Sequence, residues 1–192
     1  MALPASEAAY TFADCLAWDE NERIEIIHGK AFLMATPSRI HQEISGALFA
    51  RLYNFLEGKE CRAYPAPFGV RLFEKAGDAP EDVDTLVEPD ITVVCDSSKL
   101  DRYGCRGAPD LIVEVLSSST QRHDRLVKLG LYQRAGVREY WIVSPEEKTV
   151  QVMLRDGRGV LLLHEVYGPK DLAKVNVLDG CFIELNRVFP DE

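Results

Sequence analysis

Two segments of this sequence combine a Pro-Asp pair with a run of β-branched residues. They span residues 88–94 and 109–117, and both are bounded by Pro, Gly, Ser or Asp, which predicts two strands. The second run also carries Glu114 in its apolar centre. A carboxylate in a buried strand is costly unless it is paired or binds a cation. Glu114 therefore marks a candidate site.

A metal site follows if the two strands are antiparallel neighbours, because the start of one strand then lies beside the end of the other. Asp90 opens its strand and Glu114 lies near the close of the next, so their carboxylates are expected to converge. Asp110 shares a face with Glu114 but is four residues away, on the order of 13 Å along a strand. We expect Asp110 to cap the turn after Pro109 instead.

Two carboxylates, water and a phosphate oxygen form a typical Mg²⁺ shell, since this ion prefers oxygen and retains waters. An ion so held polarises a phosphoryl group, helps to generate hydroxide and offsets charge on the leaving oxygen. A nearby ammonium assists by orienting the water and stabilising the transition state. Lys128, on the helix predicted after Glu114, is the candidate. Each residue also has a structural explanation: Pro-Asp pairs are common in turns, and a single helical lysine is usually exposed.

The elements that position these residues are predicted from hydrophobic periodicity and turn residues. In chain order they are a helix at 11–18 with a Thr11–Asp14 capping box, a hairpin around Gly29-Lys30, a helix from Pro37 to about Leu56, a strand at 66–73, the two Pro-Asp strands, a helix at 121–134 capped by the Ser/Thr residues before it, a strand at 139–143, and a hairpin around 156–159.

Most other charged residues near these segments are predicted to lie at the surface. Glu25 is predicted to face solvent on the first hairpin, and His41 and Glu43 to be edge or surface groups of the long helix. The acidic segment 74–88 is predicted to be a solvated loop. The connector 96–108 contains the densest basic cluster beside the two strands.

The order of elements predicts an α+β fold, with a mixed central sheet flanked by two long helices and additional β-hairpins at both ends. A chain of 192 residues is expected to form a single domain over 1–192. Its core would span about 24–145, and the C-terminal hairpin extension about 146–192.

Composition restricts the protein's class and partners. The net charge of −9 argues against a protein that coats nucleic acid through a broad basic surface, but metal-binding carboxylates add to the same negative count. Five scattered cysteines without a Cys-x-x-Cys pair indicate free thiols in a reducing compartment. Because neither a signal peptide nor an apolar run of about 20 residues is found, we expect a cytoplasmic protein that does not contact a membrane.

The chain resembles the bacterial Uma-two family of restriction endonuclease-like proteins, within the PD-(D/E)XK nuclease superfamily. The resemblance covers about residues 24–145. Its matching segments are Glu88-Pro89-Asp90, Pro109 to Ser117, Lys128-x-x-x-Tyr132 and Gly136-Val137-x-Glu139-Tyr140-Trp141, with Glu25-Ile26-Ile27-His28-Gly29 and His41 upstream. Family members commonly have Asp at the position of His28.

The resemblance implies a restriction-endonuclease-like core and metal ligation by Asp90 and Glu114. The broader nuclease motif places lysine two residues after the glutamate, where this chain has Leu116. Relatives supply the amine from the following helix, which indicates Lys128. Because many enzymes that cut duplex DNA pair two active sites across a two-fold axis, a homodimer is also expected.

Two hypotheses follow. In the first, the protein is an endonuclease that hydrolyses DNA phosphodiester bonds with Mg²⁺, or Mn²⁺ as a substitute, using Asp90, Glu114 and Lys128. In the second, it is a catalytically inactive nuclease-fold module that binds nucleic acid or a protein partner, as its acidic charge and Leu116 suggest. The target sequence and the choice between DNA and RNA stay open.

Overall fold

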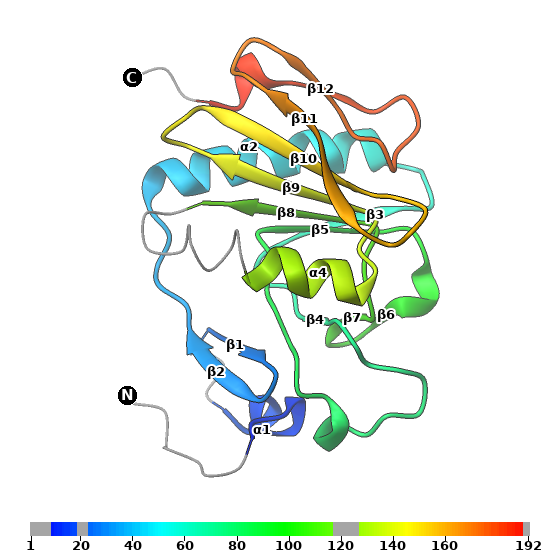
Figure 1. Ribbon diagram of the computed structural model, residues 1–192. Coiled ribbons are helices and arrows are strands. Elements are labelled where there is room, and N and C mark those ends of the chain that lie inside the picture. Colours follow the sequence, from blue (N-terminus) through cyan, green and yellow to red (C-terminus); the bar gives the residue numbers. More distant parts are fainter. Residues whose placement is uncertain (1–8, 19–22, 117–126, 190–192) are drawn as a thin grey trace.

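The computed structural model describes residues 9–18, 23–116 and 127–189. A central sheet forms the middle of the molecule, with helices on both sides and a small N-terminal unit below it in the view of Figure 1. The helices are α1 (Phe12–Ala17), α2 (Arg39–Leu56) and α4 (Leu129–Ala135). The strands are β1 (Ile24–Ile27), β2 (Lys30–Leu33), β3 (Arg62–Pro65), β4 (Val70–Arg71), β5 (Ile91–Val94), β6 (Leu100–Asp101), β7 (Gly104–Arg106), β8 (Leu111–Val115), β9 (Glu139–Ser144), β10 (Thr149–Arg155), β11 (Leu161–Tyr167), β12 (Leu172–Lys174) and β13 (Phe182–Glu184).

The central sheet has six strands in the order β11-β10-β9-β8-β5-β3. Only β8 and β9 are parallel, and the other neighbours are antiparallel, so the predicted mixed sheet is confirmed. The Pro-Asp strands β5 and β8 are adjacent and antiparallel, and every residue of both is buried. Because both faces of these strands are covered, their sequences are nearly all apolar instead of alternating.

Two hydrophobic clusters fill the space on either side of the sheet. On one side, α2 and the C-terminal segment pack on Ile91, Val113 and Trp141. On the other side, α4 and the three-stranded sheet β4-β7-β6 pack on Ile112 and Tyr140. Successive side chains of a strand alternate between these clusters. Glu114 therefore shares the α4 side with Ile112.

Helix α2 forms as its apolar spacing predicts, with Ile44, Leu48, Leu52 and Leu56 buried along one stripe. It begins after Ser38, whose side chain accepts a hydrogen bond from the backbone N–H of His41. Among the described residues, no helix has the length and apolar character that would let it span a membrane.

The N-terminal unit joins α1 to the hairpin β1–β2. The predicted capping box is present, since the Asp14 carboxylate accepts from the backbone N–H of Thr11 at 2.7 Å. Ile26 of β1 packs with Phe12 and forms a bridge to Leu86, in the segment that precedes β5. The acidic segment before Asp90 is thus attached to β1, although it was predicted to be a solvated loop throughout.

Two predicted boundaries were wrong or lie outside the described residues. Of the strand expected at 66–73, only the short β4 at Val70–Arg71 forms, and β3 lies before the predicted range. The ladder of β3 ends at Pro65, and Pro67 has no N–H with which to continue it. The helix expected at 121–134 is described only from its second half, as α4. Its predicted start and Ser/Thr cap lie outside the described residues.

The expectation of five free thiols was also wrong. Cys61 and Cys95 form a disulfide, and the other three cysteines are free. The register explains the pair: Arg62 lies opposite Val94 in β3 and β5, so the next residues outward face one another. The spacing of the two cysteines in the sequence does not reveal this contact.

Candidate functional site

A cavity of about 580 Å³ opens between α2, the hairpin β1–β2 and the adjoining ends of β5 and β8. Asp90, Glu114 and Lys128, the three residues predicted to act together, all line it. The β5–β8 register, extended by one residue, puts Asp90 directly opposite Glu114. The antiparallel pairing thus places both carboxylates at one end of the strand pair, as predicted.

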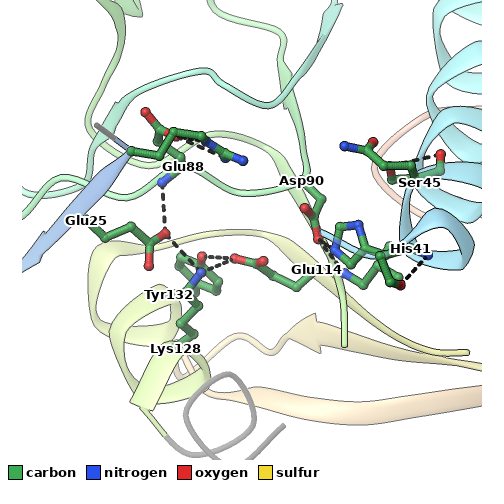
Figure 2. Close-up of polar contacts among 12 residues, drawn as sticks. Glu25, His41, Ser45, Glu88, Asp90, Glu114, Lys128 and Tyr132 are labelled. Atoms are coloured by element: carbon green, nitrogen blue, oxygen red, sulfur yellow. Dashed lines mark hydrogen bonds and ion pairs between the residues drawn. The ribbon is translucent and has the colours of Figure 1, made fainter. Parts of the chain in front are cut away.

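Asp90 continues the β5–β8 ladder with its side chain. Its Oδ2 accepts a hydrogen bond from the backbone N–H of Val115 at 2.7 Å, and His41 Nε2 lies 3.1 Å from the same oxygen. Figure 2 shows the Asp90 carboxylate turned toward His41. Both contacts use Oδ2, and Oδ1 has no recorded hydrogen bond to the described residues. Asp90 is therefore fixed in position at the cavity by two contacts to one of its oxygens.

Glu114 lies in a buried polar cluster with Lys128 and Tyr132. Its Oε1 accepts from Lys128 Nζ at 2.8 Å and from the Tyr132 hydroxyl at 2.6 Å. Lys128 immediately precedes α4 and is only 3% exposed, and Tyr132 lies one turn further along the helix. The sequence row Lys128-x-x-x-Tyr132 therefore places two donors on one carboxylate.

Glu25 completes this cluster, which corrects the prediction that it faces solvent. It is 4% exposed, and its Oε1 accepts from Lys128 Nζ and from the backbone N–H of Glu88, both at 3.0 Å. Glu88 in turn pairs with Arg23, with 3.0 Å between Oε2 and Nη2. Lys128 is thus held between two carboxylates from different strands, as Figure 2 shows.

Burial and charge shift the pKa values of two groups here. Burial raises the pKa of Tyr132 well above its usual value, and the neighbouring charges of Glu114 and Glu25 raise it further, so the hydroxyl remains a neutral donor. Burial by itself lowers the pKa of His41, but the hydrogen bond to Asp90 and its charge outweigh this, and the pKa of His41 is raised overall.

The other predicted residues do not join the cavity lining. Asp110 lies at the opposite end of the strand pair, where it accepts from the backbone N–H of Cys95 at 2.8 Å and pairs with Arg138. The prediction that it caps the turn after Pro109 was wrong, because its carboxylate instead caps the end of β5. Glu43 pairs with Arg39 on the surface, and Lys99 of the basic connector donates to the carbonyl of Ala108.

The donor set of this cavity suits a hard divalent cation. Asp90 and Glu114 supply carboxylate oxygens from facing strand positions, and Mg²⁺ is commonly held by one or two carboxylates plus water. Among the residues that the structure describes, no group of three or more His, Cys, Asp or Glu side chains could hold a metal. An ion here would therefore rely on these two carboxylates together with water and substrate oxygens.

The sequence analysis missed Glu25 and the contact of His41 with Asp90. For Glu25 a signal existed: Ile27 shares its strand face, which indicates that this face is buried. For His41 the signal was its spacing on the helix. Ser45 and Phe49 follow it at helical spacing and line the same cavity. Neither pattern identifies the partner. Lys128 is 103 residues from Glu25 in the sequence, and Asp90 is more than 40 residues from His41.

Comparisons with known proteins identify chains that this protein resembles. An uncharacterized protein of the cyanobacterium Synechocystis is 27% identical over 156 residues, which cover 77% of this chain and 75% of that protein. A crystal structure described as "a putative nuclease belonging to DUF820", from Anabaena variabilis, superimposes with a TM-score of 0.71 at 20% identity. That match covers 94% of this chain and 97% of the other, so the two share a fold.

The family model for Uma2, described as "Putative restriction endonuclease", matches residues 12–186. The match includes every residue of the buried cluster and the whole central sheet. The chain therefore belongs to the Uma2 family.

Proposed function

We propose that this protein is an endonuclease that hydrolyses phosphodiester bonds of DNA with the help of a divalent metal ion, Mg²⁺ or its substitute Mn²⁺. One observation carries the proposal: Asp90 and Glu114 occupy facing positions at one end of a buried strand pair, and Lys128 Nζ lies 2.8 Å from Glu114. The family match and the nuclease-like fold support the same class of function.

In this proposal Asp90 and Glu114 are the metal ligands. A bound divalent cation would polarise the phosphoryl group and promote ionisation of a water molecule. The chain's own groups orient the ligands: the Val115 N–H and His41 fix Asp90, and the Tyr132 hydroxyl fixes Glu114. Lys128 contributes a positive charge beside the attacked phosphate and stabilises the charge that develops in the transition state.

Glu25 acts on Lys128 and not on the substrate. Its Oε1 is fixed by the backbone N–H of Glu88 and holds the ammonium from the side opposite to Glu114. The lysine is therefore positioned by residues that are 103 and 14 positions away in the chain. This arrangement supplies the amine that Leu116 cannot supply, since Leu116 is an apolar residue buried in the core on the α4 side.

The proposal is tested by nicking of supercoiled plasmid and by calorimetric titration with Mg²⁺. Wild-type protein is expected to nick DNA with Mg²⁺ or Mn²⁺, and Glu114→Gln is expected to lose both cleavage and ion binding. Asp110→Asn is the matched control, because this residue comes from the same sequence motif but lies outside the cavity. Absence of cleavage of DNA and RNA by pure wild-type protein with either ion would refute the enzymatic proposal.

A second candidate is a nuclease-fold module that binds nucleic acid or a protein without cutting. The net charge of −9 and the buried Leu116 in the usual lysine position favour it. It predicts binding that needs no metal and that persists in Asp90→Asn. The plasmid and calorimetric assays separate the two candidates, because only the endonuclease requires both carboxylates for a metal-dependent signal.

Two further proposals concern the setting of the protein. We propose that it acts as a homodimer, since two linked active sites would allow both strands of a duplex to be cut. We also propose a cytoplasmic location. The reducing environment there would oppose the disulfide between Cys61 and Cys95. Light scattering tests the first, and counting free thiols in protein isolated under alkylating conditions tests the redox state.

A further inference from the structure

The cavity also has an apolar wall. Phe32 and Leu33 of β2 line it, together with Phe49 of α2 and Pro65 at the end of β3. Phe32 is 38% exposed and Leu33 is 56% exposed, so both large apolar side chains are partly accessible to solvent. The hairpin register makes Phe32 the direct cross-strand partner of Glu25. Such partners have Cβ atoms about 5 Å apart, so the aromatic ring lies beside the cluster that contains Lys128.

A glycine in the middle of α2 forms part of the cavity lining. Gly46 lines the cavity, and a Cβ atom added there would meet no atom within 4 Å. Glycine weakens a helix interior relative to alanine, and in α2 no close packing of the described residues requires it. A longer side chain at this position would therefore extend into the space that the cavity lining surrounds.

The charges around the cavity do not suit a duplex. Among the described lining residues, the basic side chains are Arg23, His41 and Lys128, and each of them contacts a carboxylate. Binding along duplex DNA requires neutralisation of many phosphates by Lys and Arg, whereas the whole chain carries −9. Substrates held chiefly by stacking of bases on aromatic rings need fewer ionic contacts.

We infer that the apolar wall of this cavity receives an unpaired nucleobase, so that the site takes single-stranded DNA in preference to an intact duplex. The base stacks against Phe32 while its phosphate lies toward Asp90, Glu114 and Lys128. Bases within a duplex are stacked and paired, and they cannot reach the ring unless a nucleotide leaves the helix. A cavity of about 580 Å³ falls within the range of sites for small ligands. This inference rests on the proposed function for the position of the phosphate.

The test uses the full chain and a labelled 15-nucleotide single strand, with the blunt duplex of the same sequence as the second probe. Binding is measured by fluorescence anisotropy with and without Mg²⁺, and cleavage is followed on gels in parallel. Phe32→Ala removes the stacking ring, and Phe182→Ala removes a more exposed ring on β13, outside the cavity. Gly46→Leu adds a large side chain to the cavity lining, and Gly46→Ala is its matched control with a similar gain in helix propensity.

We expect the wild type to bind the single strand at least about tenfold more tightly than the duplex, and Phe32→Ala to weaken that binding about tenfold, as stacking on one ring predicts. Gly46→Leu should weaken it similarly, while Gly46→Ala and Phe182→Ala should not. Thermal unfolding should show that both Gly46 variants fold. A change that appears equally in Phe32→Ala and Phe182→Ala would overturn the inference, because it would be unspecific.

The outcomes for the inference and for the proposed function are separable. Equal binding and cleavage of duplex and single strand, unaffected by Gly46→Leu, would overturn the inference and leave the endonuclease intact. Single-strand binding that depends on Phe32 and Gly46 without any cleavage would support the stacking site and refute the endonuclease. An otherwise identical RNA strand forms a third arm, and preferential binding of RNA would overturn the assignment to DNA.

Discussion

The two ends of the β5–β8 strand pair are built alike but differ in what they can do. At each end a Pro-Asp aspartate accepts a hydrogen bond from the backbone N–H just past its cross-strand partner, from Val115 to Asp90 at 2.7 Å and from Cys95 to Asp110 at 2.8 Å. The antiparallel register relates the two ends by an approximate two-fold axis between the strands. Both aspartates thus terminate a ladder in the same way.

The difference lies in the residue opposite each aspartate. Extending the register by one residue puts Glu114 opposite Asp90 and Val94 opposite Asp110. Val94 belongs to the hydrophobic core, and Asp110 is balanced by Arg138, whose side chain is 58% exposed. The motif itself is therefore structural at both ends. A second acid across the pair, with a buried lysine beside it, is what makes one end a candidate catalytic site.

The largest expected difference between the ends is in catalysis. Asp90→Asn and Glu114→Gln should each reduce plasmid nicking by at least about 10³-fold, since each removes a proposed metal ligand and with it transition-state stabilisation. Asp110→Asn should leave nicking within about twofold of wild type under conditions in which the variant is folded. A comparable loss in Asp110→Asn would show that the two ends are not functionally distinct.

The next largest effect concerns Lys128 and stability. Lys128→Met should lower the free energy of unfolding by about 3–5 kcal/mol, because it leaves the buried carboxylates of Glu25 and Glu114 without their shared ammonium. Urea denaturation of wild type and variant measures this difference. The double variant Lys128→Met with Glu25→Gln should recover part of the lost free energy of unfolding. If it recovers none, that result would argue against the shared ion pair.

At the other end, Asp110→Ala should destabilise the fold by about 1–3 kcal/mol, because the backbone N–H of Cys95 loses its acceptor. The exposed partner Arg138 should contribute little, so Arg138→Ala is expected to cost less than about 1 kcal/mol. Denaturation curves for both variants test this order. If Arg138→Ala lowered the free energy of unfolding more than Asp110→Ala does, the ion pair, and not the hydrogen bond from Cys95, would fix this end.

The smallest effect is the pH dependence contributed by His41. Its pKa in the folded protein is raised above the unfolded value, so its contribution to stability is fully present below the unfolded pKa and is lost as the pH rises through the folded pKa. The stability difference between wild type and His41→Gln should therefore shrink from about pH 6 upward. Denaturation across this range tests it, and a difference that grows with pH would contradict it.

Particular residues show how far prediction from the sequence extended. Asp90, Glu114 and Lys128 were predicted together because a carboxylate in an apolar strand and an ordered set of motifs are local signals, and all three line one cavity. Their catalytic roles stay predictions. Glu25 was misassigned because an acid on a hairpin strand is usually exposed. Its burial depends on a lysine 103 residues away.

The sequence alone determined the two Pro-Asp strands, the strand β9, the long helix and the mixed sheet, because periodicity and turn residues act over a few neighbouring positions. Only the tertiary structure decided that one Pro-Asp aspartate faces a glutamate and the other a valine, that Cys61 meets Cys95, and that Phe32 lies beside Glu25. The physical reason is that strand register and the docking of the hairpin depend on contacts between distant segments, which no local pattern specifies.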